Sequence, residues 1–71
     1  MLPDRLKQLR AERNLTQRVV AIGINITERN YQRFERGTVN PSHEAFVALA
    51  SFFDVSLDYL VGRTDKPEVN R

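Results

Sequence analysis

The sequence has no cysteine and only one histidine, His43. Disulfides and cysteine-based metal sites are therefore excluded, and a single imidazole cannot build a metal site from histidine ligands. We expect neither a metal nor a cofactor. A chain of 71 residues without such crosslinks must be stabilised by helix packing, helped by dimerisation.

Long apolar runs are also absent. No segment approaches the roughly 20 apolar residues of a membrane-spanning helix, and the N-terminal segment MLPDRLKQLR lacks the apolar core of a signal peptide. The sequence offers no recognisable arrangement of a nucleophile, a base and an orienting group. We therefore predict a cytoplasmic protein that is not bound to a membrane and is not an enzyme.

Charge is distributed unevenly along the chain. The net charge is +2, but residues 1–40 carry eight basic and four acidic side chains, whereas residues 41–71 carry three basic and five acidic ones. Nine of the eleven basic residues are arginines, the cation suited to bidentate contacts with phosphate and guanine. The basic half indicates a polyanionic partner; an ordinary solvated surface is the alternative on charge alone.

The apolar periodicity and the capping residues predict five short helices around one core. The first helix is expected over residues 3–13, and the next four follow caps at Thr16, Thr27, Ser42 and Ser56. Asn25 is the expected left-handed turn residue, and Gly37 and Gly62 end two of the helices. We predict one domain over residues 1–65 and a flexible polar tail over residues 66–71. The predicted core consists of Leu6, Leu9, Val20, Ala21, Ile24, Ile26, Tyr31, Phe34, Phe46, Leu49, Ala50, Phe53, Val55, Leu57, Leu60 and Val61.

The stretch Thr16–Gly37 has the form of a helix-turn-helix, two capped helices around a tight turn. On a helical wheel of about 100° per residue, Arg29, Gln32, Arg33 and Arg36 point away from the inward Tyr31 and Phe34. Arginine can bind guanine and glutamine can bind adenine through two hydrogen bonds each. A solvated helix face is the plainer interpretation, but the two caps, the turn and the basic surroundings favour a helix that reads DNA.

Several short motifs occur along the chain in a fixed order. They are Leu15-Thr16-Gln17, Ala21, Ile24-Asn25-Ile26-Thr27, Phe34-Glu35-Arg36-Gly37, Asn40-Pro41-Ser42, Leu49-Ala50 and Asp54-Val55-Ser56-Leu57-Asp58-Tyr59-Leu60. In this order and spacing they resemble one family, the lambdoid-phage repressor and Cro-like (Xre-type) DNA-binding domains. The resemblance covers about residues 4–65, and it implies an all-α, compact five-helix, lambda-repressor-like domain. Its helix-turn-helix would be formed by the second and third helices.

The resemblance also implies roles for individual residues. Thr27, Glu28, Arg29 and Arg33 match base-reading positions, and Gln32 matches a position nearer the backbone. We also expect Gln32 to read bases, because its amide is on the outward side of the same helix. The residues expected near the phosphate backbone are Gln17, Asn30, Arg36, Thr38, Asn40, Ser42 and His43. Tyr59, Val61 and Arg63 match a dimer contact. Glu35 falls near the inward face of its helix, so its charge needs a partner, and the resemblance supplies Arg10 as a structural ion pair.

These features together predict a sequence-specific DNA-binding transcriptional regulator. We expect a repressor that binds double-stranded DNA at a near-palindromic operator as a homodimer. The alternative is an antitoxin or adaptor module whose main partner is another protein. Val19 and Ile22, which point away from the apolar face of their helix, and the acidic C-terminal half favour that alternative.

Overall fold

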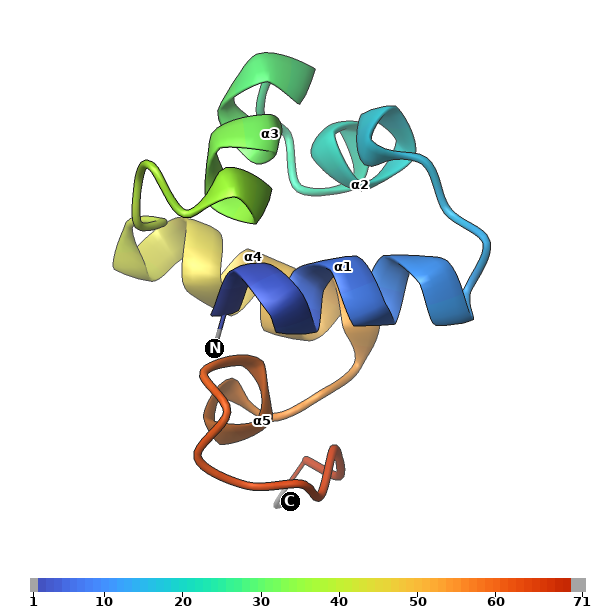
Figure 1. The fold of residues 1–71 in the computed structure, drawn as a ribbon, viewed down its shortest axis with the longest axis vertical. Coiled ribbons are helices and arrows are strands. Elements are labelled where there is room, and N and C mark those ends of the chain that lie inside the picture. Colours follow the sequence, from blue (N-terminus) through green and yellow to red (C-terminus); the bar gives the residue numbers. More distant parts are fainter. Residues whose placement is uncertain (1, 70–71) are drawn as a thin grey trace.

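The computed structural model describes residues 2–69 and contains five α-helices and no strand within that range. The helices are α1 (Leu2–Glu12), α2 (Gln17–Gly23), α3 (Glu28–Arg36), α4 (His43–Phe53) and α5 (Leu57–Leu60). Figure 1 shows α2 and α3 at one end of the molecule, α1 and α4 across its middle, and α5 at the other end. None of these helices is long and apolar enough to cross a membrane. The predicted all-α, five-helix architecture is confirmed.

Short-range interactions set the ends of the helices. The hydroxyl groups of Thr16, Thr27, Ser42 and Ser56 each accept a hydrogen bond from the backbone N–H three residues on, as N-caps do. Asn25 adopts a left-handed conformation with φ of 62° in the turn between α2 and α3. Gly37, with φ of 76°, ends α3. These ends were predicted because each depends on residues close in sequence.

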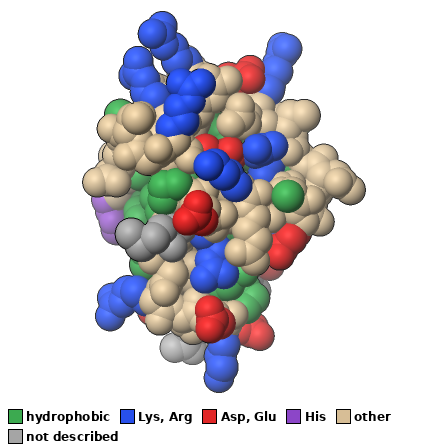
Figure 2. Space-filling view, viewed as in Figure 1, with side chains coloured by type: hydrophobic (Ala, Val, Ile, Leu, Met, Phe, Trp, Pro, Cys, Tyr) green, Lys and Arg blue, Asp and Glu red, His purple; other side chains and the backbone are tan. Residues whose placement is uncertain are grey.

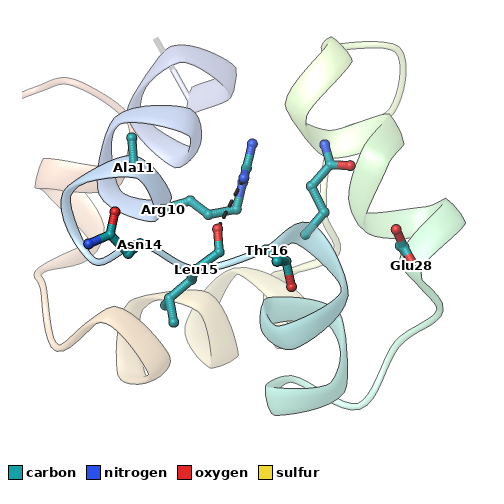
Figure 3. A pocket seen from close by; sticks show the side chains of 7 residues that line it. Arg10, Ala11, Asn14, Leu15, Thr16 and Glu28 are labelled. Carbon is teal, nitrogen blue, oxygen red and sulfur yellow. Dashed lines mark hydrogen bonds between the residues drawn. The ribbon is translucent and has the colours of Figure 1, made fainter.

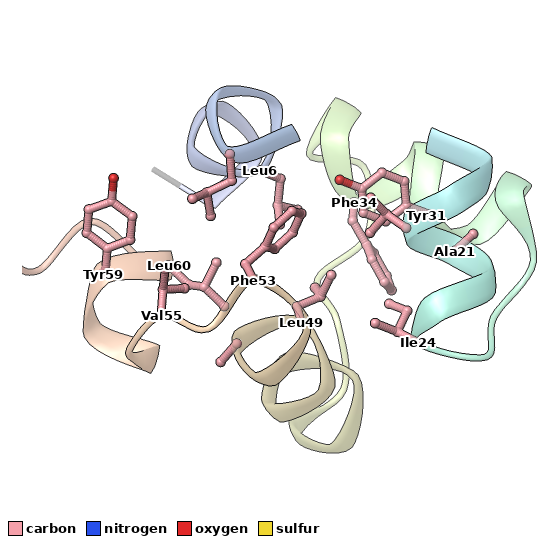
Figure 4. Close-up of a cluster of buried hydrophobic side chains, with 13 residues drawn as sticks. Leu6, Ala21, Ile24, Tyr31, Phe34, Leu49, Phe53, Val55, Tyr59 and Leu60 are labelled. Atoms are coloured by element: carbon pink, nitrogen blue, oxygen red, sulfur yellow. The ribbon is translucent and has the colours of Figure 1, made fainter. Parts of the chain in front are cut away.

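A single apolar core joins all five helices. Figure 4 shows side chains from α1 and α4 meeting those of α2 and α3 on one side and those of α5 on the other. Phe53 and Leu49 of α4 are almost fully buried at the centre. The buried core consists of Leu6, Leu9, Val20, Ala21, Ile24, Tyr31, Phe34, Leu49, Ala50, Phe53, Val55, Tyr59 and Leu60. This core holds the short α2 and α3 at a fixed angle, although helices of this length are not stable alone.

The core prediction was wrong at Leu57 and at the half-buried Val61, and it omitted Tyr59. Leu57 is 41% exposed, whereas Tyr59 is only 6% exposed. The reason is that α5 has four residues, too few for a periodic apolar pattern to indicate which side faces inward. The Arg5 guanidinium lies 3.8 Å from the centre of the Tyr59 ring and covers it as a cation–π partner.

Gly23 is the last residue of α2 and lies against the Phe52 ring. A β-carbon built at this position would stand 2.6 Å from Cδ1 of Phe52 and still nearer to the next ring atom. Phe52 is half-buried and packs edge-on against Phe53, with ring centres 5.1 Å apart. Glycine therefore allows α2 and α4 to approach closely, which no pattern around residue 23 indicated.

We predict that Gly23→Ala lowers the free energy of unfolding by about 1–3 kcal/mol, the range for overpacking a well-filled site. In an ordinary helix the same change stabilises by about 0.5–1 kcal/mol. Urea denaturation of Gly23→Ala alone and together with Phe52→Ala measures the coupling between the two positions. In the Phe52→Ala background the alanine should be neutral or stabilising; an equal loss in both backgrounds would refute the steric explanation.

The segment after α5 returns to the body of the domain. The Pro67 carbonyl accepts a hydrogen bond of 3.0 Å from the Ser56 amide, and the Asp65 carboxylate lies 3.9 Å from the Arg5 guanidinium. Pro67 therefore lies against the start of α5, and residues 70–71 of the predicted tail are outside the described residues. The flexibility expected for residues 66–71 stays a prediction.

Candidate nucleic-acid interface

Helices α2 and α3 form a rigid pair around a short turn. The N–H of Ile26 donates to the Ala21 carbonyl at 3.0 Å, and the N–H of Asn25 donates to Ile22 at 3.1 Å. Tyr31 and Phe34 of α3 are buried, with their rings edge to face and 6.4 Å apart. One side of α3 is thus fixed in the core, and its opposite side is free to meet another molecule.

The expected ion pair between Arg10 and Glu35 is present and fastens α3 to α1. Arg10 Nε and Nη2 donate to the two carboxylate oxygens of Glu35 at 2.8 and 3.1 Å. Arg10 Nη1 also donates to the Leu15 carbonyl at 3.1 Å, and Gln17 Nε2 donates to Glu35 at 3.1 Å. Glu35 is only 2% exposed. One carboxylate therefore connects α1, α2 and α3.

The electrostatics of this cluster favour a charged Glu35. Burial by itself would raise the pKa of Glu35. The hydrogen bonds from Arg10, the neighbouring Tyr31 phenol, the hydrogen bond from Gln17 and the charge of Arg10 outweigh burial and hold the pKa below its usual range. The same carboxylate raises the pKa of Arg10. Burial, followed by the nearby Glu35, raises the pKa of the Tyr31 phenol well above its usual range.

We predict that acid weakens the fold partly through Glu35. Because its pKa is lowered by folding, its contribution is present above the unfolded pKa of about 4.3 and is lost as pH falls through the folded value. The free energy of unfolding, measured by urea denaturation from pH 7 to pH 2, should fall more steeply for the wild type than for Glu35→Gln. Parallel pH profiles for the two proteins would contradict this assignment.

The arginines of residues 2–69 fall into two groups. Arg5, Arg10, Arg13 and Arg63 each form an ion pair with a carboxylate. Within the described part of the chain, the side chains of the other four make no hydrogen bond or ion pair, and all four belong to α2 or α3: Arg18, Arg29, Arg33 and Arg36. Figure 2 shows basic side chains gathered at the end formed by α2 and α3, whereas basic and acidic side chains lie together nearer α5. Among residues 2–69, the arginines without an acidic partner thus all belong to the helix-turn-helix.

A shallow groove follows the outward side of α3. It is lined by five of the residues singled out from the sequence: Glu28, Arg29, Gln32, Arg33 and Arg36. Gln32 Nε2 and Glu28 Oε2 are 3.5 Å apart and form a hydrogen bond between successive turns. Asn30 is exposed beside the groove, and the hydroxyl oxygen of Thr27 accepts from the Asn30 amide as the N-cap. The groove therefore combines three guanidinium groups with a carboxylate–amide pair.

A second hollow lies where the N-terminal ends of α2 and α3 approach the end of α1. Figure 3 shows Arg10, Asn14, Thr16 and Glu28 around it, and Gln17 also lines it. Gln17 is half-buried because its amide is bonded to Glu35. The first backbone N–H groups of α2 are directed toward this end of the helix, as in anion-binding sites of other proteins.

The loop between α3 and α4 contains the remaining predicted phosphate contacts. The Thr38 hydroxyl donates to the Arg33 carbonyl at 3.3 Å and helps to close α3. The Ser42 oxygen accepts from the Ala45 amide at 3.2 Å and caps α4. Asn40 and His43 are exposed. Thr38 and Ser42 therefore stabilise helix ends in the free chain. The N-terminal backbone amides of α4 are additional hydrogen-bond donors for a phosphate.

The sequence did not single out Arg18. Arg18 is exposed in the first turn of α2. Like the α3 arginines, its side chain makes no ion pair or hydrogen bond within residues 2–69. The only signal in the sequence was its position directly after Gln17, because the lack of an acidic partner becomes visible only in three dimensions.

The three residues expected at a dimer contact differ in exposure: Tyr59 is buried in the core of its own chain, Val61 is half-buried and Arg63 is exposed. Within residues 2–69, no group of three or more histidine, cysteine or acidic side chains could hold a metal ion.

Comparison with known proteins identifies the family. Residues 6–60 match the family model described as helix-turn-helix, which covers most of the chain and includes the α2–α3 unit. The chain belongs to this helix-turn-helix family. This family is of the Xre or Cro/C1 type. Its members are DNA-binding domains of transcriptional regulators and not enzymes.

Named relatives in bacteria carry the same domain. The chain is 38% identical over 68 residues to an uncharacterized HTH-type transcriptional regulator, YobD, of Bacillus subtilis, covering 96% of this chain and 61% of that protein. It is 35% identical over 65 residues to the cryptic phage CTXphi transcriptional repressor RstR of Vibrio cholerae, covering 92% and 59%. The chain thus spans about 60% of the length of these relatives.

Solved structures agree with the fold. A transcriptional regulator from Listeria innocua superimposes with a TM-score of 0.82 at 27% identity, over 100% of this chain and 62% of the other. The DNA-binding domain of the P22 C2 repressor superimposes with a TM-score of 0.84 over 99% and 91%, at 21% identity. The second likeness concerns the fold alone. Together they support the predicted lambda-repressor-like, five-helix architecture.

Proposed function

We propose that this chain is a sequence-specific DNA-binding domain of a transcriptional regulator, a repressor that binds a near-palindromic operator as a homodimer. The observation that carries the proposal is the set of four exposed arginines on α2 and α3, whose side chains have no partner within residues 2–69. Such a surface fits a polyanion. The family membership and the transcriptional repressor among the relatives support the same function.

The proposed mechanism assigns the outward side of α3 to the major groove. Thr27, Glu28, Arg29, Gln32 and Arg33 would face base edges. Backbone phosphates would be held by Gln17, Arg18, Asn30, Arg36, Thr38, Asn40, Ser42 and His43. The ion pair of Arg10 with Glu35 would keep α3 in position while these contacts form.

The homodimer is a geometric requirement of a two-fold operator. Two copies would place their α3 helices about 34 Å apart, in successive major grooves. An apolar hollow supports a contact between copies near the start of α1 and the end of α5, and its lining includes Pro3, Pro41, Phe46 and Val61. Val61 and Arg63 stay in the proposed interface, whereas the burial of Tyr59 leaves it little surface to contribute.

Selection of DNA from a random duplex library tests this function. The chain should enrich one motif with two half-sites related by two-fold symmetry, and affinity for it should fall steeply as salt rises because phosphate contacts release counterions. Sedimentation of the complex should give two chains per duplex. A library that shows no enriched sequence would reject the proposal, and a single chain per duplex would reject its dimer component.

A protein partner is a second candidate, favoured by one apolar surface. Val19 and Ile22 on α2 are 44% and 67% exposed, and they lie on the helix that precedes the proposed reading helix. An antitoxin or adaptor would use such a surface. Purification from the native host, followed by mass spectrometry, tests it: a stoichiometric protein bound across α3 and competing with DNA would favour this function.

A further inference from the structure

We propose that α3 reads a G·C-rich core in each half of its DNA site, with Arg29 and Arg33 each binding a guanine. The inference rests on the proposed function and specifies the bases that the helix selects. It begins from a row of arginines on the outward side of α3: Arg29, Arg33 and Arg36 follow an i, i+4, i+7 spacing and line one groove. Such a row lies within about 60° of the helix circumference and extends about 10 Å.

The hydrogen-bonding character of this row selects among the four bases. A guanidinium group carries only donors. Guanine presents two adjacent acceptors, N7 and O6, in the major groove, whereas adenine presents one acceptor beside a donor, and thymine presents one acceptor beside a methyl group. Two neighbouring guanidinium groups therefore match guanines better than any other base. Arg29 and Arg33 have no hydrogen bond or ion pair within residues 2–69 that would have to be broken first.

The neighbouring side of the groove supplies acceptors. Glu28 and Gln32 are joined by the 3.5 Å hydrogen bond from Gln32 Nε2 to Glu28 Oε2. That bond uses one of the two N–H donors of the Gln32 amide and leaves the Gln32 carbonyl oxygen and the second Glu28 oxygen as acceptors. A cytosine presents the N4 donor beside the acceptors of its guanine. The arginine row and the Glu28–Gln32 pair together therefore match the complete major-groove edge of G·C pairs.

The position of each arginine along α3 divides their roles. Arg29 is in the first turn, and Arg33, one turn further, lies at the start of the last turn, whereas Arg36 is the last residue before Gly37 ends the helix. The N-terminal part of a reading helix is the part that enters the groove in this class of motif. Arg29 and Arg33 are therefore assigned to guanines, and Arg36 to the phosphate backbone.

Duplex selection with three proteins tests the inference: the wild type, Arg29→Gln and Arg33→Gln. The wild type should enrich two guanines at fixed places in each half-site. Each variant should replace one of them by adenine, because glutamine reads adenine N6 and N7. Lys66→Gln is the matched control. It also removes one exposed positive charge, from the tail at the end of the molecule opposite α3 (Figure 1), and it should leave the motif unchanged.

A change made only in the DNA removes any dependence on the folding of variants. Replacing either guanine by 7-deazaguanine deletes the N7 acceptor but keeps base pairing. Each replacement should weaken binding of the wild type by about 5- to 150-fold. A motif without guanines, or one insensitive to this replacement, would overturn the inference while the proposed function stands. If the wild type enriched no motif, the proposed function itself would fail.

Discussion

Arg10→Ala should lower the free energy of unfolding by about 3–5 kcal/mol, because it leaves a buried carboxylate without its cation. A domain of 71 residues has a total stability of only about 4–10 kcal/mol. Glu35 is 2% exposed and would keep only the hydrogen bond from Gln17. The Leu15 carbonyl would lose its donor as well. The variant should therefore be close to unfolding at room temperature. Urea denaturation followed by circular dichroism measures its free energy of unfolding.

Two further variants show whether the loss comes from the unpaired charge. Arg63→Ala breaks an exposed ion pair of 3.7 Å with Asp58 and should cost at most about 1 kcal/mol. The double variant Arg10→Met with Glu35→Leu removes both charges and should be more stable than Arg10→Met alone. If the double variant were the less stable of the two, the loss in Arg10→Met could not come from the unpaired Glu35 carboxylate.

Replacing Arg18, Arg29, Arg33 and Arg36 together by glutamine should reduce affinity for the selected duplex by about 1,000-fold or more. Each base contact contributes about 1–3 kcal/mol, and each lost phosphate contact should flatten the salt dependence by about 0.9 in logarithmic slope. Stability should change little, because these exposed side chains have no partner within residues 2–69 and surface substitutions usually stay within about 0.5 kcal/mol each.

The comparison protein for this experiment is Lys7→Gln with Lys66→Gln. It removes two exposed positive charges from α1 and the tail. Fluorescence anisotropy over a range of salt concentrations should give a far smaller loss per removed charge than the four-arginine variant. Equal losses per charge would mean that net charge, and not the surface of α2 and α3, governs binding.

Much of the fold could be predicted because its determinants are local. The four hydroxyl caps, the left-handed Asn25 and the terminating Gly37 act within three or four residues of their own positions. The apolar stripe of α4 is likewise visible in the sequence. The reversal of Leu57 and Tyr59 could not be predicted, because the four-residue α5 has no period and its orientation follows from packing against α1.

The candidate site was predictable in composition but not in organisation. The outward position of Arg29, Arg33 and Arg36 follows from the helical period. Within the described residues, all the unpaired arginines belong to α2 and α3, because carboxylates pair with every other arginine. This pairing, and with it the place of Arg18 in the site, is visible only in the folded chain. Gly23 depends on Phe52, which is distant in sequence and adjacent only in the folded chain.

We propose that the outward side of α3 is the surface that meets DNA. Titration of the ¹⁵N-labelled chain with the selected duplex, followed by amide chemical shifts, tests it directly. The largest changes should fall on α3, on the first turn of α2 and on the loop from Thr38 to His43. Changes confined to α4 and α5, with α3 unaffected, would show that another surface of the domain binds the duplex.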